Sequence, residues 1–413
     1  MFWYNIGIKM YAAGIQLAAL IGNPKAKQWI QGRKESPTNK LTKPCIWIHA
    51  ASLGEFEQAR PLLETLHKKY PNYSILLTFF SPSGYEIRKN YPLAQQVIYL
   101  PIDTIANAQH FIRTFQPVLA IFIKYEFWYN YLQILHSHKI PVLYVSTIFR
   151  KNQYFFQWYG KSFLSILNTV THFFVQNKES VVLLHTQHIA QATLTGDTRL
   201  DRVLEIANTK YQNENIQKFV SNHFTVVAGS TWDKDIDVLA KTNQLLHADN
   251  PTLTCKWILV PHEISTPNLL YIEKQFTTKK TIRYTAITPT TTFEGIDVLI
   301  MDTMGMLASI YKYATITYVG GGFGKGIHNI LEPIAWHKPV AFGIRYQKFQ
   351  EAHDLIQRNI VQVITTPSDM LDYITKHTDI QPNSTIPIQN YIQSNKGATD
   401  TILYYIEANK LLP

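Results

Sequence analysis

Residues 319–333 read Val-Gly-Gly-Gly-Phe-Gly-Lys-Gly-Ile-His-Asn-Ile-Leu-Glu-Pro and join two elements of different kinds. The β-branched run before the glycines, residues 314–319, predicts a buried strand. Glycine lets the backbone approach a ligand closely, and a helix N-terminus offers free N–H groups to a phosphate. We therefore predict that Asn329 caps a helix with Glu332 in its first turn, and that the loop around Lys325 binds a phosphate.

Two common phosphate-binding motifs do not fit this loop. A P-loop requires Ser or Thr after Gly-Lys, but Gly326 follows Lys325. The glycines stand at 320, 321, 322, 324 and 326 and offer no G-x-G-x-x-G register, which disfavours a dehydrogenase. A glycine-rich turn without a ligand is the alternative, but the density of glycines beside a lysine and a cap favours binding. Glu332 would then accept hydrogen bonds from ribose hydroxyls.

The apolar runs expected to form strands fall into two sets, which predicts two domains. A chain of 413 residues is too long for one ordinary core. Helical stretches lie between most of the runs, as in doubly wound α/β domains with parallel sheets. Residues 366–369, Thr-Pro-Ser-Asp, predict a helix start with a cap, a proline at the first position and an acid at the third. The strands are expected at residues 46–50, 74–80, 96–102, 119–125, 141–147, 172–177 and 193–197, and then at 224–231, 256–261, 283–288, 298–303, 315–319, 339–344 and 361–365.

Residues 1–43 are aromatic, apolar and basic. Seven Lys and Arg residues stand there against one acid, Glu35, in a chain of net charge +10. Asn5, Lys9 and Gln16 interrupt the apolar run, which is marginal for a membrane-spanning helix and lacks a signal-peptide pattern. An amphipathic helix lying on an anionic bilayer and a helix packed on the protein's own core both remain open. No nucleic-acid motif accompanies the basic charge, so we expect no nucleic-acid partner.

Polar residues follow several strands of the first domain, at the edge where open α/β sheets bind ligands. Glu55 opens a helix after residues 46–50 and either removes a proton from a hydroxyl or is an ordinary helix-dipole partner. Glu126 either orients a cationic or hydroxyl partner or forms an ion pair. The turn at residues 81–84 either binds a carboxylate or sugar hydroxyls or is only a helix cap. Arg199 follows another strand and a glycine turn, and His49 is expected to be a core histidine.

The strands of the second domain end in a similar way. Ser230 and Thr231 leave a strand and would bind phosphate at the start of the next helix, and residues 302–305 end another strand. His262 and Glu263 are adjacent, which is poor spacing for two metal ligands on one element. The sequence has no H-E-x-x-H motif or Cys/His cluster, so we predict no bound metal.

Five motifs occur in an order that resembles the Kdo transferases, which attach 3-deoxy-D-manno-octulosonic acid (Kdo) to the lipid A precursor of lipopolysaccharide. The resemblance covers nearly the whole chain, including the membrane-proximal N-terminal segment. Each piece alone is weak, but S-x-G-E early combined with H-N-x-L-E-P after the glycines is specific. The motifs are Gly54-Glu55 after a Trp-Ile-His-Ala strand, Glu126-Phe-Trp128, Gly229-Ser-Thr231, Asp302-Thr-Met-Gly305, and the glycine loop ending in His328-Asn-Ile-Leu-Glu-Pro333.

The resemblance implies an α/β protein of the GT-B fold, with two Rossmann-like doubly wound domains facing each other across a cleft. The implied reaction is transfer of Kdo from CMP-Kdo to the lipid A precursor, lipid IVA, with inversion and with CMP as the leaving group. Glu55 would be the general base, and no cofactor or metal is expected. The enzyme would lie at the cytoplasmic face of the cell inner membrane, on its anionic surface or held by a single N-terminal anchor.

The implied domains are a membrane-proximal segment at 1–43, an acceptor domain at 44–207, a nucleotide domain at 208–385 and a C-terminal helix at 386–413 that packs back on the acceptor domain. Glu126 matches the family's second N-terminal acid, and Glu332 would hold the cytidine ribose. The substrate-binding residues expected are Ser52, Gly54, Ser83, Gly84, Glu126 and Arg199. The nucleotide-binding residues expected are Ser230, Thr231, Pro261, His262, Asp302, Thr303, Met304, Gly305, Gly321, Gly322, Lys325, Asn329 and Glu332.

Two departures from the family pattern concern charge. The family commonly has Pro-Arg-His where this chain has Val-Pro-His at 260–262, so an arginine near the nucleotide is missing. Lys256, Lys325 or Arg345 would replace its charge. The family's E-x-E-x-W-P run reads Lys-Tyr-Glu-Phe-Trp-Tyr at 124–129 and lacks the first acid and the proline.

Two other functions stay open on the sequence alone. One is a GT-B glycosyltransferase that uses a different sugar nucleotide, which would differ in the nucleotide that stabilises the protein. The other is a non-catalytic binding or scaffold protein on the membrane surface, in which Glu55 would be replaceable.

Overall fold

The chain is described here from a computed structural model, over residues 2–35, 40–221, 223–250, 253–378 and 385–412. It divides into two compact units, one formed by Met1–Arg202 with Asn395–Pro413 and the other by Val203–Ser394.

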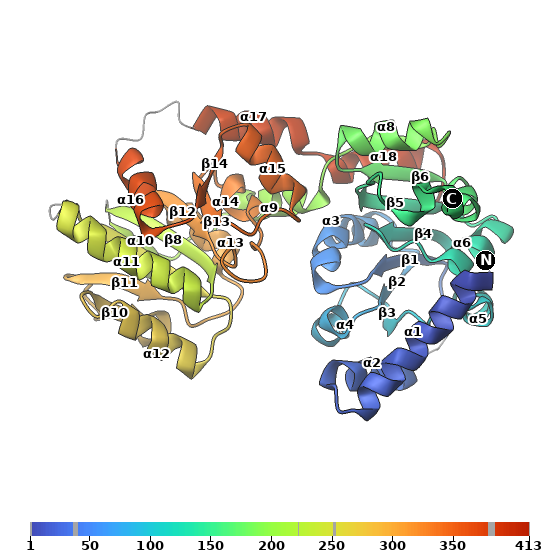
Figure 1. The fold of residues 1–413 in the computed structure, drawn as a ribbon, viewed down its shortest axis with the longest axis horizontal. Helices are drawn as coiled ribbons and strands as arrows, with labels where there is room; N and C mark the ends of the chain where they lie inside the picture. Colours follow the sequence, from blue (N-terminus) through green and yellow to red (C-terminus); the bar gives the residue numbers. More distant parts are fainter. Residues whose placement is uncertain (1, 36–39, 222, 251–252, 379–384, 413) are drawn as a thin grey trace. The chain divides into compact units, whose positions relative to one another are not determined.

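The first unit is built on one sheet of seven parallel strands, in the order β3-β2-β1-β4-β5-β6-β7 (Figure 1). Every residue of the central strand β1 is buried, which explains its continuous apolar sequence. The strands are β1 Cys45–Ala50, β2 Ser74–Phe79, β3 Gln96–Tyr99, β4 Pro117–Ile123, β5 Val142–Thr147, β6 His172–Val175 and β7 Ala192–Leu194.

Helices cover both faces of this sheet. On one face Trp47 packs among residues of α5 and α6, and on the other Phe56 of α3 shares a core with Ile402 and Ile406 of α18. The C-terminal helix α18 therefore completes the first unit. The helices are α3 Leu53–Lys69, α4 Pro82–Arg88, α5 Ile105–Phe115, α6 Tyr129–Ser137, α7 Lys161–Leu167, α8 Lys178–Thr186, α9 Thr198–Asn208 and α18 Ala398–Ala408, with short 3-10 turns η1 Tyr154–Phe156 and η2 Trp158–Gly160.

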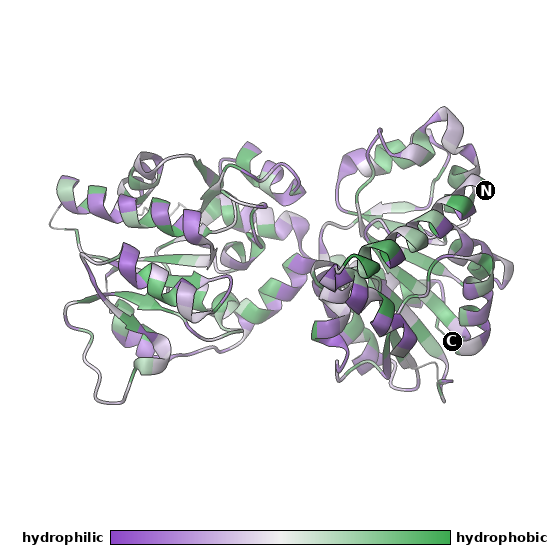
Figure 2. Cartoon of the chain, turned by 60° about the horizontal axis from the view of Figure 1, so that its bottom comes forward, coloured by the Kyte–Doolittle hydropathy of each residue, from purple (hydrophilic) through white to green (hydrophobic). Residues whose placement is uncertain are grey.

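The second unit repeats the architecture with a sheet of order β10-β11-β9-β8-β12-β13-β14, again all parallel. Figure 2 shows the strands of both sheets mostly green, between helices with purple outer faces. The strands are β8 Phe224–Thr231, β9 Cys255–Pro261, β10 Lys280–Arg283, β11 Ile296–Ile300, β12 Ile316–Val319, β13 Val340–Gly343 and β14 Val361–Ile364. The helical elements are α10 Glu214–Val220, α11 Asp233–Asp249, α12 Thr266–Gln275, α13 Leu307–Ile310, α14 Leu331–Ala335, α15 Gln350–Gln357, α16 Pro367–Lys376, α17 Ile386–Asn395, η3 Tyr284–Ala286 and η4 Tyr311–Tyr313.

Two expected elements differ from the structure. The strand expected at 283–288 is β10, which ends at Arg283 and is followed by the 3-10 turn η3. The single C-terminal helix expected at 386–413 is two helices, because Gly397 takes the left-handed conformation between α17 and α18 (φ +88°).

The N-terminal segment forms two helices, α1 Phe2–Leu20 and α2 Pro24–Glu35. One side of α1 contacts the first unit, where the Tyr4 hydroxyl donates to Asp103 over 2.6 Å and the Asn5 side chain accepts from Asn130 over 2.9 Å. No described residue of α1 is buried. The sequence left open whether this segment packs on the protein or lies on a bilayer. In the structure α1 packs on the protein along one side, and its other residues are not covered. The apolar residues exposed at α1 and just after it include Phe2, Trp3, Met10, Leu17, Leu20 and Ile21.

Among the helices of the described residues, none has both the length and the apolar character that crossing a membrane requires.

Candidate active site

Glu55 and Glu126 flank the point in the first sheet where the strand order reverses. From β1 the strands are added toward one side of the sheet as far as β3, and from β4 they are added toward the other side as far as β7, so the order reverses between the neighbouring strands β1 and β4. Glu55 lies in the first turn of α3, just after β1, and Glu126 follows β4. Ligands of open α/β sheets bind at the carboxyl ends of the strands at such a switch point. The topology therefore places both acids where the first unit would hold a substrate.

The carboxylate of Glu55 is half-buried, and its pKa is raised. Burial and, after it, the negative charge of Glu126 together raise the pKa of Glu55 to about 7, although Lys124 and the N–H groups of Ala51 and Ser52 oppose the shift. Its Oε2 atom accepts from the Ala51 N–H over 2.5 Å. Glu55 thus accepts a backbone hydrogen bond at the start of its helix, in line with the alternative that it is a helix-dipole partner. Its raised pKa also suits a general base near neutral pH.

His49 is a core histidine with a defined hydrogen-bonding role. It is fully buried on β1, and its Nδ1 atom lies 2.8 Å from the hydroxyl of Thr78. Its Nε2 atom lies 3.3 Å from the indole nitrogen of Trp128 and 3.8 Å from Glu126. Because an indole N–H can only donate, Nε2 must accept and Nδ1 must carry the proton. The Thr78 hydroxyl then accepts from both His49 and Trp47, whose indole nitrogen is 2.8 Å away.

The other residues expected around Glu55 lie at the same sheet edge in different environments. Ser52 is the N-cap residue of α3 without a side-chain cap bond, and Gly54 is exposed. In the next turn, Ser83 lies in the first turn of α4 and its N–H is capped by Ser81. Gly84 is buried, and a Cβ there would lie only 2.3 Å from the Phe79 ring. The turn at residues 81–84 thus contains a helix cap, formed by Ser81, and it leaves the Ser83 side chain exposed.

Arg199 is engaged within the protein. Its Nε and Nη2 atoms donate to the carboxylate of Asp197 over 2.9 and 2.6 Å, and Asp197 also accepts from Gln58 over 3.0 Å. The pairing with Arg199 holds the pKa of Asp197 below its usual range despite burial. The guanidinium therefore orders the loop between β7 and α9, and the sequence did not show that its partner lies two residues earlier.

In the second unit, the glycine loop lies at the corresponding switch point. The strand order reverses between β8 and β12, and the loop follows β12. Gly321 takes a left-handed conformation (φ +91°), and a Cβ there would lie 2.3 Å from the Gly326 carbonyl. At Gly322 a Cβ would lie 2.5 Å from the backbone of Gly343. The loop is therefore tightly packed and requires glycine at both positions, with Lys325 exposed at its outer side.

Asp235 ties this loop to the start of α11, a role that we did not anticipate from the sequence. The buried carboxylate accepts from the Gly321 N–H over 2.9 Å, from the Trp232 N–H over 2.9 Å and from the Tyr318 hydroxyl over 2.7 Å. Burial nevertheless raises its pKa. An acid at the third position of a helix is a known capping signal and could have drawn attention to Asp235, although its bond to Gly321 could not be read from the sequence.

Ser230 and Thr231 lie at the end of β8, but their hydroxyls differ in access. Thr231 is buried, and its hydroxyl donates weakly to the Val260 carbonyl over 3.4 Å. Ser230 is half-buried and takes a left-handed conformation (φ 54°) at a register shift between β8 and β9. The next helix does not start with these hydroxyls, because Trp232 is the N-cap of α11.

Three rings form a stack at the ends of β8 and β9 and beside the loop. The ring of His262, which follows Pro261, lies between the Trp232 ring at 4.7 Å and the His328 ring at 4.2 Å, measured between centroids. The Trp232 indole also donates to His328 over 3.1 Å. Burial lowers the pKa of His328 to about 4, and it lowers that of His262 too. The stack is therefore uncharged at neutral pH.

The segment after β11 is partly committed to local contacts. Asp302 accepts from the N–H of Thr285 over 2.9 Å and also from its hydroxyl. The Thr303 hydroxyl lies 3.1 Å from the sulfur of Met306. Met304 is exposed, and Gly305 takes a positive φ of 85° in the turn.

The predicted cap at Asn329 is wrong in its position. The helix α14 is only five residues long and its N-cap is Ile330, so Asn329 lies one residue before the cap. Its side-chain oxygen still accepts from the Leu331 N–H over 3.2 Å, and its amide donates to Glu332 over 3.2 Å. Glu332 lies in the first turn, as expected.

The three residues expected to replace the charge of the missing arginine lie at different places in the second unit. Lys256 lies near the amino end of β9, where it contacts Asp297 over 3.2 Å, so it is at the wrong end of the strand. Arg345 follows β13 and donates to the Gly324 carbonyl over 2.8 Å. Arg345 and Lys325 are thus both at the glycine loop and remain candidates.

No group of three or more His, Cys, Asp and Glu side chains that could hold a metal ion occurs within the described part of the chain.

Comparison with known proteins identifies the same family as the motifs. A family model described as 3-deoxy-D-manno-octulosonic-acid transferase (kdotransferase) matches residues 24–202. The 3-deoxy-D-manno-octulosonic acid transferase of Rickettsia felis is 26% identical over 377 residues, which cover 87% of this chain and 78% of that protein. The transferase of the same name from Aquifex aeolicus is 25% identical over 361 residues, covering 85% and 92%.

Among solved structures, a putative UDP-N-acetylglucosamine 2-epimerase from Listeria monocytogenes aligns with a TM-score of 0.60 at 10% identity, over 89% of this chain and 97% of that one. At this identity the likeness shows the fold alone, which is an α/β fold of the GT-B kind. The family model covers most of the first unit, and the similarity to whole transferases extends through the second. The first unit therefore matches the Kdo transferase model, and most of the chain is similar to whole Kdo transferases at about 25% identity.

Proposed function

We propose that this protein transfers Kdo from CMP-Kdo to the lipid A precursor, with inversion at the anomeric carbon. The observation that carries the proposal is Glu55, a half-buried carboxylate whose pKa is raised to about 7 at the switch point of the first sheet. A base with this pKa is about half ionised at neutral pH, so a useful fraction of it can take up a proton.

In the proposed step, Glu55 takes the proton from an acceptor sugar hydroxyl as that oxygen attacks the anomeric carbon of Kdo. The new oxygen–carbon bond forms while the bond from that carbon to the phosphate of CMP breaks, and CMP leaves with the electron pair. The negative charge of Glu126 favours protonation of Glu55 as the reaction proceeds. No metal or cofactor is required by this assignment.

The second unit is proposed to bind the CMP portion of the donor. The glycine loop, Ser230 and Arg345 lie at its carboxyl edge, where a phosphate would meet backbone N–H groups and positive charge. Glu332, in the first turn of α14, is proposed to bind the ribose.

The acceptor is a lipid, and we propose that the enzyme works peripherally on the cytoplasmic face of the inner membrane. The side of α1 that faces away from the protein exposes Trp3, Leu17 and Leu20. The net charge of +10 would draw the protein to an anionic surface.

The test is transfer of labelled Kdo to a lipid A precursor in detergent micelles, with CMP-Kdo generated in situ and without added metal. Glu55→Gln should lose most of the product while retaining its fold. Glu57→Gln is the matched control, because Glu57 lies on the same helix and pairs with Arg88 over 2.9 Å. Near wild-type turnover by Glu55→Gln would remove Glu55 as the base. No product from the wild type, with CMP still raising its melting temperature, would point to another sugar or acceptor.

A further inference from the structure

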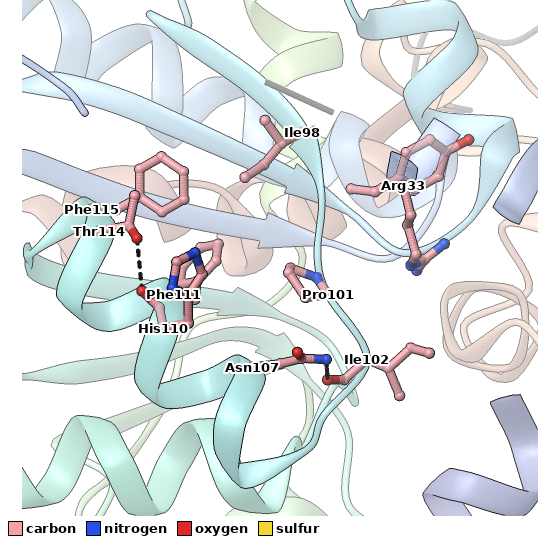
Figure 3. Close-up of a pocket in the computed structure, with 10 residues that line it drawn as sticks. Arg33, Ile98, Pro101, Ile102, Asn107, His110, Phe111, Thr114 and Phe115 are labelled. Carbon is pink, nitrogen blue, oxygen red and sulfur yellow. Dashed lines mark hydrogen bonds between the residues drawn. The ribbon is translucent and has the colours of Figure 1, made fainter. Parts of the chain in front are cut away.

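An apolar cavity of about 220 Å³ lies at the open edge of the first sheet, between β3, α2 and α5 (Figure 3). β3 is an edge strand, so no further strand covers this side. In Figure 3 Arg33 lies on one side of the cavity, and α5 supplies Phe111, Thr114 and Phe115 from the other.

The cavity is lined mainly by apolar side chains, and two of its polar side chains are already bonded within the protein. Ile98, Phe111 and Phe115 are buried side chains of the surrounding core. The Asn107 amide donates to the Ile102 carbonyl over 2.8 Å, and the Thr114 hydroxyl donates to the His110 carbonyl over 2.8 Å. What the walls offer a ligand is therefore mainly apolar surface.

Arg33 puts a cation beside this apolar space. Its guanidinium lies 3.4 Å from the Trp29 ring centroid and donates to the carbonyls of Leu100, Trp29 and Phe80 over 3.2, 3.3 and 3.0 Å. These partners, drawn from the described residues, are neutral, and they occupy three of the five N–H groups of the side chain. A half-buried cation with neutral partners and an apolar cavity next to it fits a ligand that is both anionic and lipophilic.

The Arg33 end of the cavity lies at the carboxyl ends of the strands, as Glu55 does, whereas Thr114, near the end of α5, lies toward the start of β4. Leu100 and Phe80, which bind Arg33, directly follow β3 and β2. Glu55 follows β1, two strands from β3, and adjacent strands are about 4.8 Å apart, so the lateral separation is about 10 Å. A sugar with its hydroxyl at Glu55 could therefore direct an attached chain toward the cavity.

The N-terminal helices connect the cavity to the exposed apolar side of α1. Tyr11 of α1 packs on Trp29 and Phe80, with ring centroids at 6.5 and 6.1 Å, and these two rings flank Arg33. A chain that leaves a bilayer along α1 would meet the aromatic cluster around Arg33 first.

We propose that this cavity receives one acyl chain of the lipid acceptor, with Arg33 beside the polar end of that chain. The proposal rests on the proposed function, since it assigns a binding site for the acceptor of that reaction. The acyl chain thus acts as a specificity element that holds the acceptor sugar at Glu55.

The steric test is to fill the cavity from α5. Thr114→Trp places a large ring in the cavity, and Thr114→Met fills less of it in case tryptophan disturbs folding. Arg113→Trp is the control, because Arg113 is exposed on the outer side of the same helix. Each variant is assayed for transfer to the lipid A precursor, with melting temperature and the CMP-induced thermal shift measured alongside.

We expect Thr114→Trp to raise the KM for the acceptor about tenfold with kcat within about twofold, and Arg113→Trp to match the wild type. A dodecyl phosphate with a diazirine at its chain end gives a second readout on the wild type. It should label the peptide spanning residues 98–115, and the acceptor should displace it.

Three outcomes would overturn the proposal: an unchanged KM in Thr114→Trp and Thr114→Met, labelling confined to residues 2–21, or labelling of 98–115 that excess acceptor does not displace. In the last case another lipid fills the cavity. Product from the wild type with an unchanged KM in the variants refutes the acyl site alone. A wild type that makes no product refutes the proposed function.

Discussion

The indole nitrogen of Trp128 donates a hydrogen bond to Nε2 of His49 over 3.3 Å. This bond links a fully buried strand residue to the motif that carries Glu126, whose carboxylate lies 3.8 Å from the same imidazole nitrogen. Trp128 also packs on Phe80, with ring centroids 4.8 Å apart. His49 is therefore a positioning residue for the acidic edge of the first sheet.

We expect His49→Leu to lower transfer about tenfold and to cost about 1–3 kcal/mol of unfolding free energy, because it leaves the Trp128 indole N–H without its acceptor and the Thr78 hydroxyl with Trp47 as its remaining donor. The CMP-induced thermal shift should not change, since the nucleotide residues are in the other unit. His49→Gln can still accept from Trp128 and should recover part of the rate. Equal losses in both variants would show that only packing matters at this position.

The rate of transfer should depend on pH through Glu55. The base must be ionised, so kcat/KM should fall about tenfold per pH unit below about 7. Glu126→Gln removes a charge that raises the pKa of Glu55, and the acidic limb of the profile should move to lower pH. An acidic limb that stays in place in Glu126→Gln would contradict the coupling of the two carboxylates.

Glu55 should also affect stability in a defined direction. Its pKa is raised from 4.5 to about 7 in the folded protein, so its contribution is favourable below pH 4.5 and is lost as the pH rises through 7. Glu55→Gln should therefore be more stable than the wild type at pH 8, by on the order of 2 kcal/mol, with a difference that shrinks toward pH 4. Denaturant unfolding at both pH values measures this, and a difference independent of pH would be inconsistent with the raised pKa.

Asp235→Ala should weaken CMP binding by at least tenfold, because Gly321, Trp232 and Tyr318 lose their common acceptor. Leaving these groups unpaired in a buried site should cost about 2–4 kcal/mol of stability. Asp233→Ala is the control, since Asp233 lies exposed in the same helical turn. CMP titration by calorimetry separates the two, and equal affinity in both variants would remove Asp235 from the organisation of the loop.

Leu17→Glu should reduce binding to vesicles that contain anionic lipid by several-fold, because the exposed apolar side of α1 would carry a charge. Gln16→Glu adds the same charge at a neighbouring exposed position where no apolar contact is lost. Vesicle flotation measures the difference. If both variants bind equally less, charge alone accounts for membrane attraction and the apolar side of α1 is not inserted.

Most of the strands could be predicted because strands buried on both faces of a parallel sheet are continuous apolar runs, whereas the partly exposed edge strand β10 has no such run and was expected too late in the sequence. The start of α16 was also predictable, since Thr366 and Asp369 form the expected capping box. At Asn329 the same reasoning failed by one residue, because α14 is a single short turn whose position is set by the packed glycine loop. Local signals thus place long elements well and short ones poorly.

Side-chain roles that depend on contacts between distant segments could not be predicted. The motifs identified Glu55 and Glu126 as acids at strand ends, but the proximity that raises the pKa of Glu55 arises only when β1 and β4 become neighbours in the sheet. Lys256 was one of three basic residues that we expected to replace the charge of the missing arginine near His262. The length of β9 separates the two residues to opposite ends of the strand.

The return of α18 to the first unit has a consequence for biosynthesis. Asp201 accepts from the N–H groups of Gly397 and Thr399, each over 2.7 Å, and α18 shares the core of α3. The second unit is continuous in the chain, whereas the first awaits residues translated after it. On the ribosome, the second unit can therefore complete its folding first, and the unit that carries Glu55 acquires α18 only after the second unit has been translated.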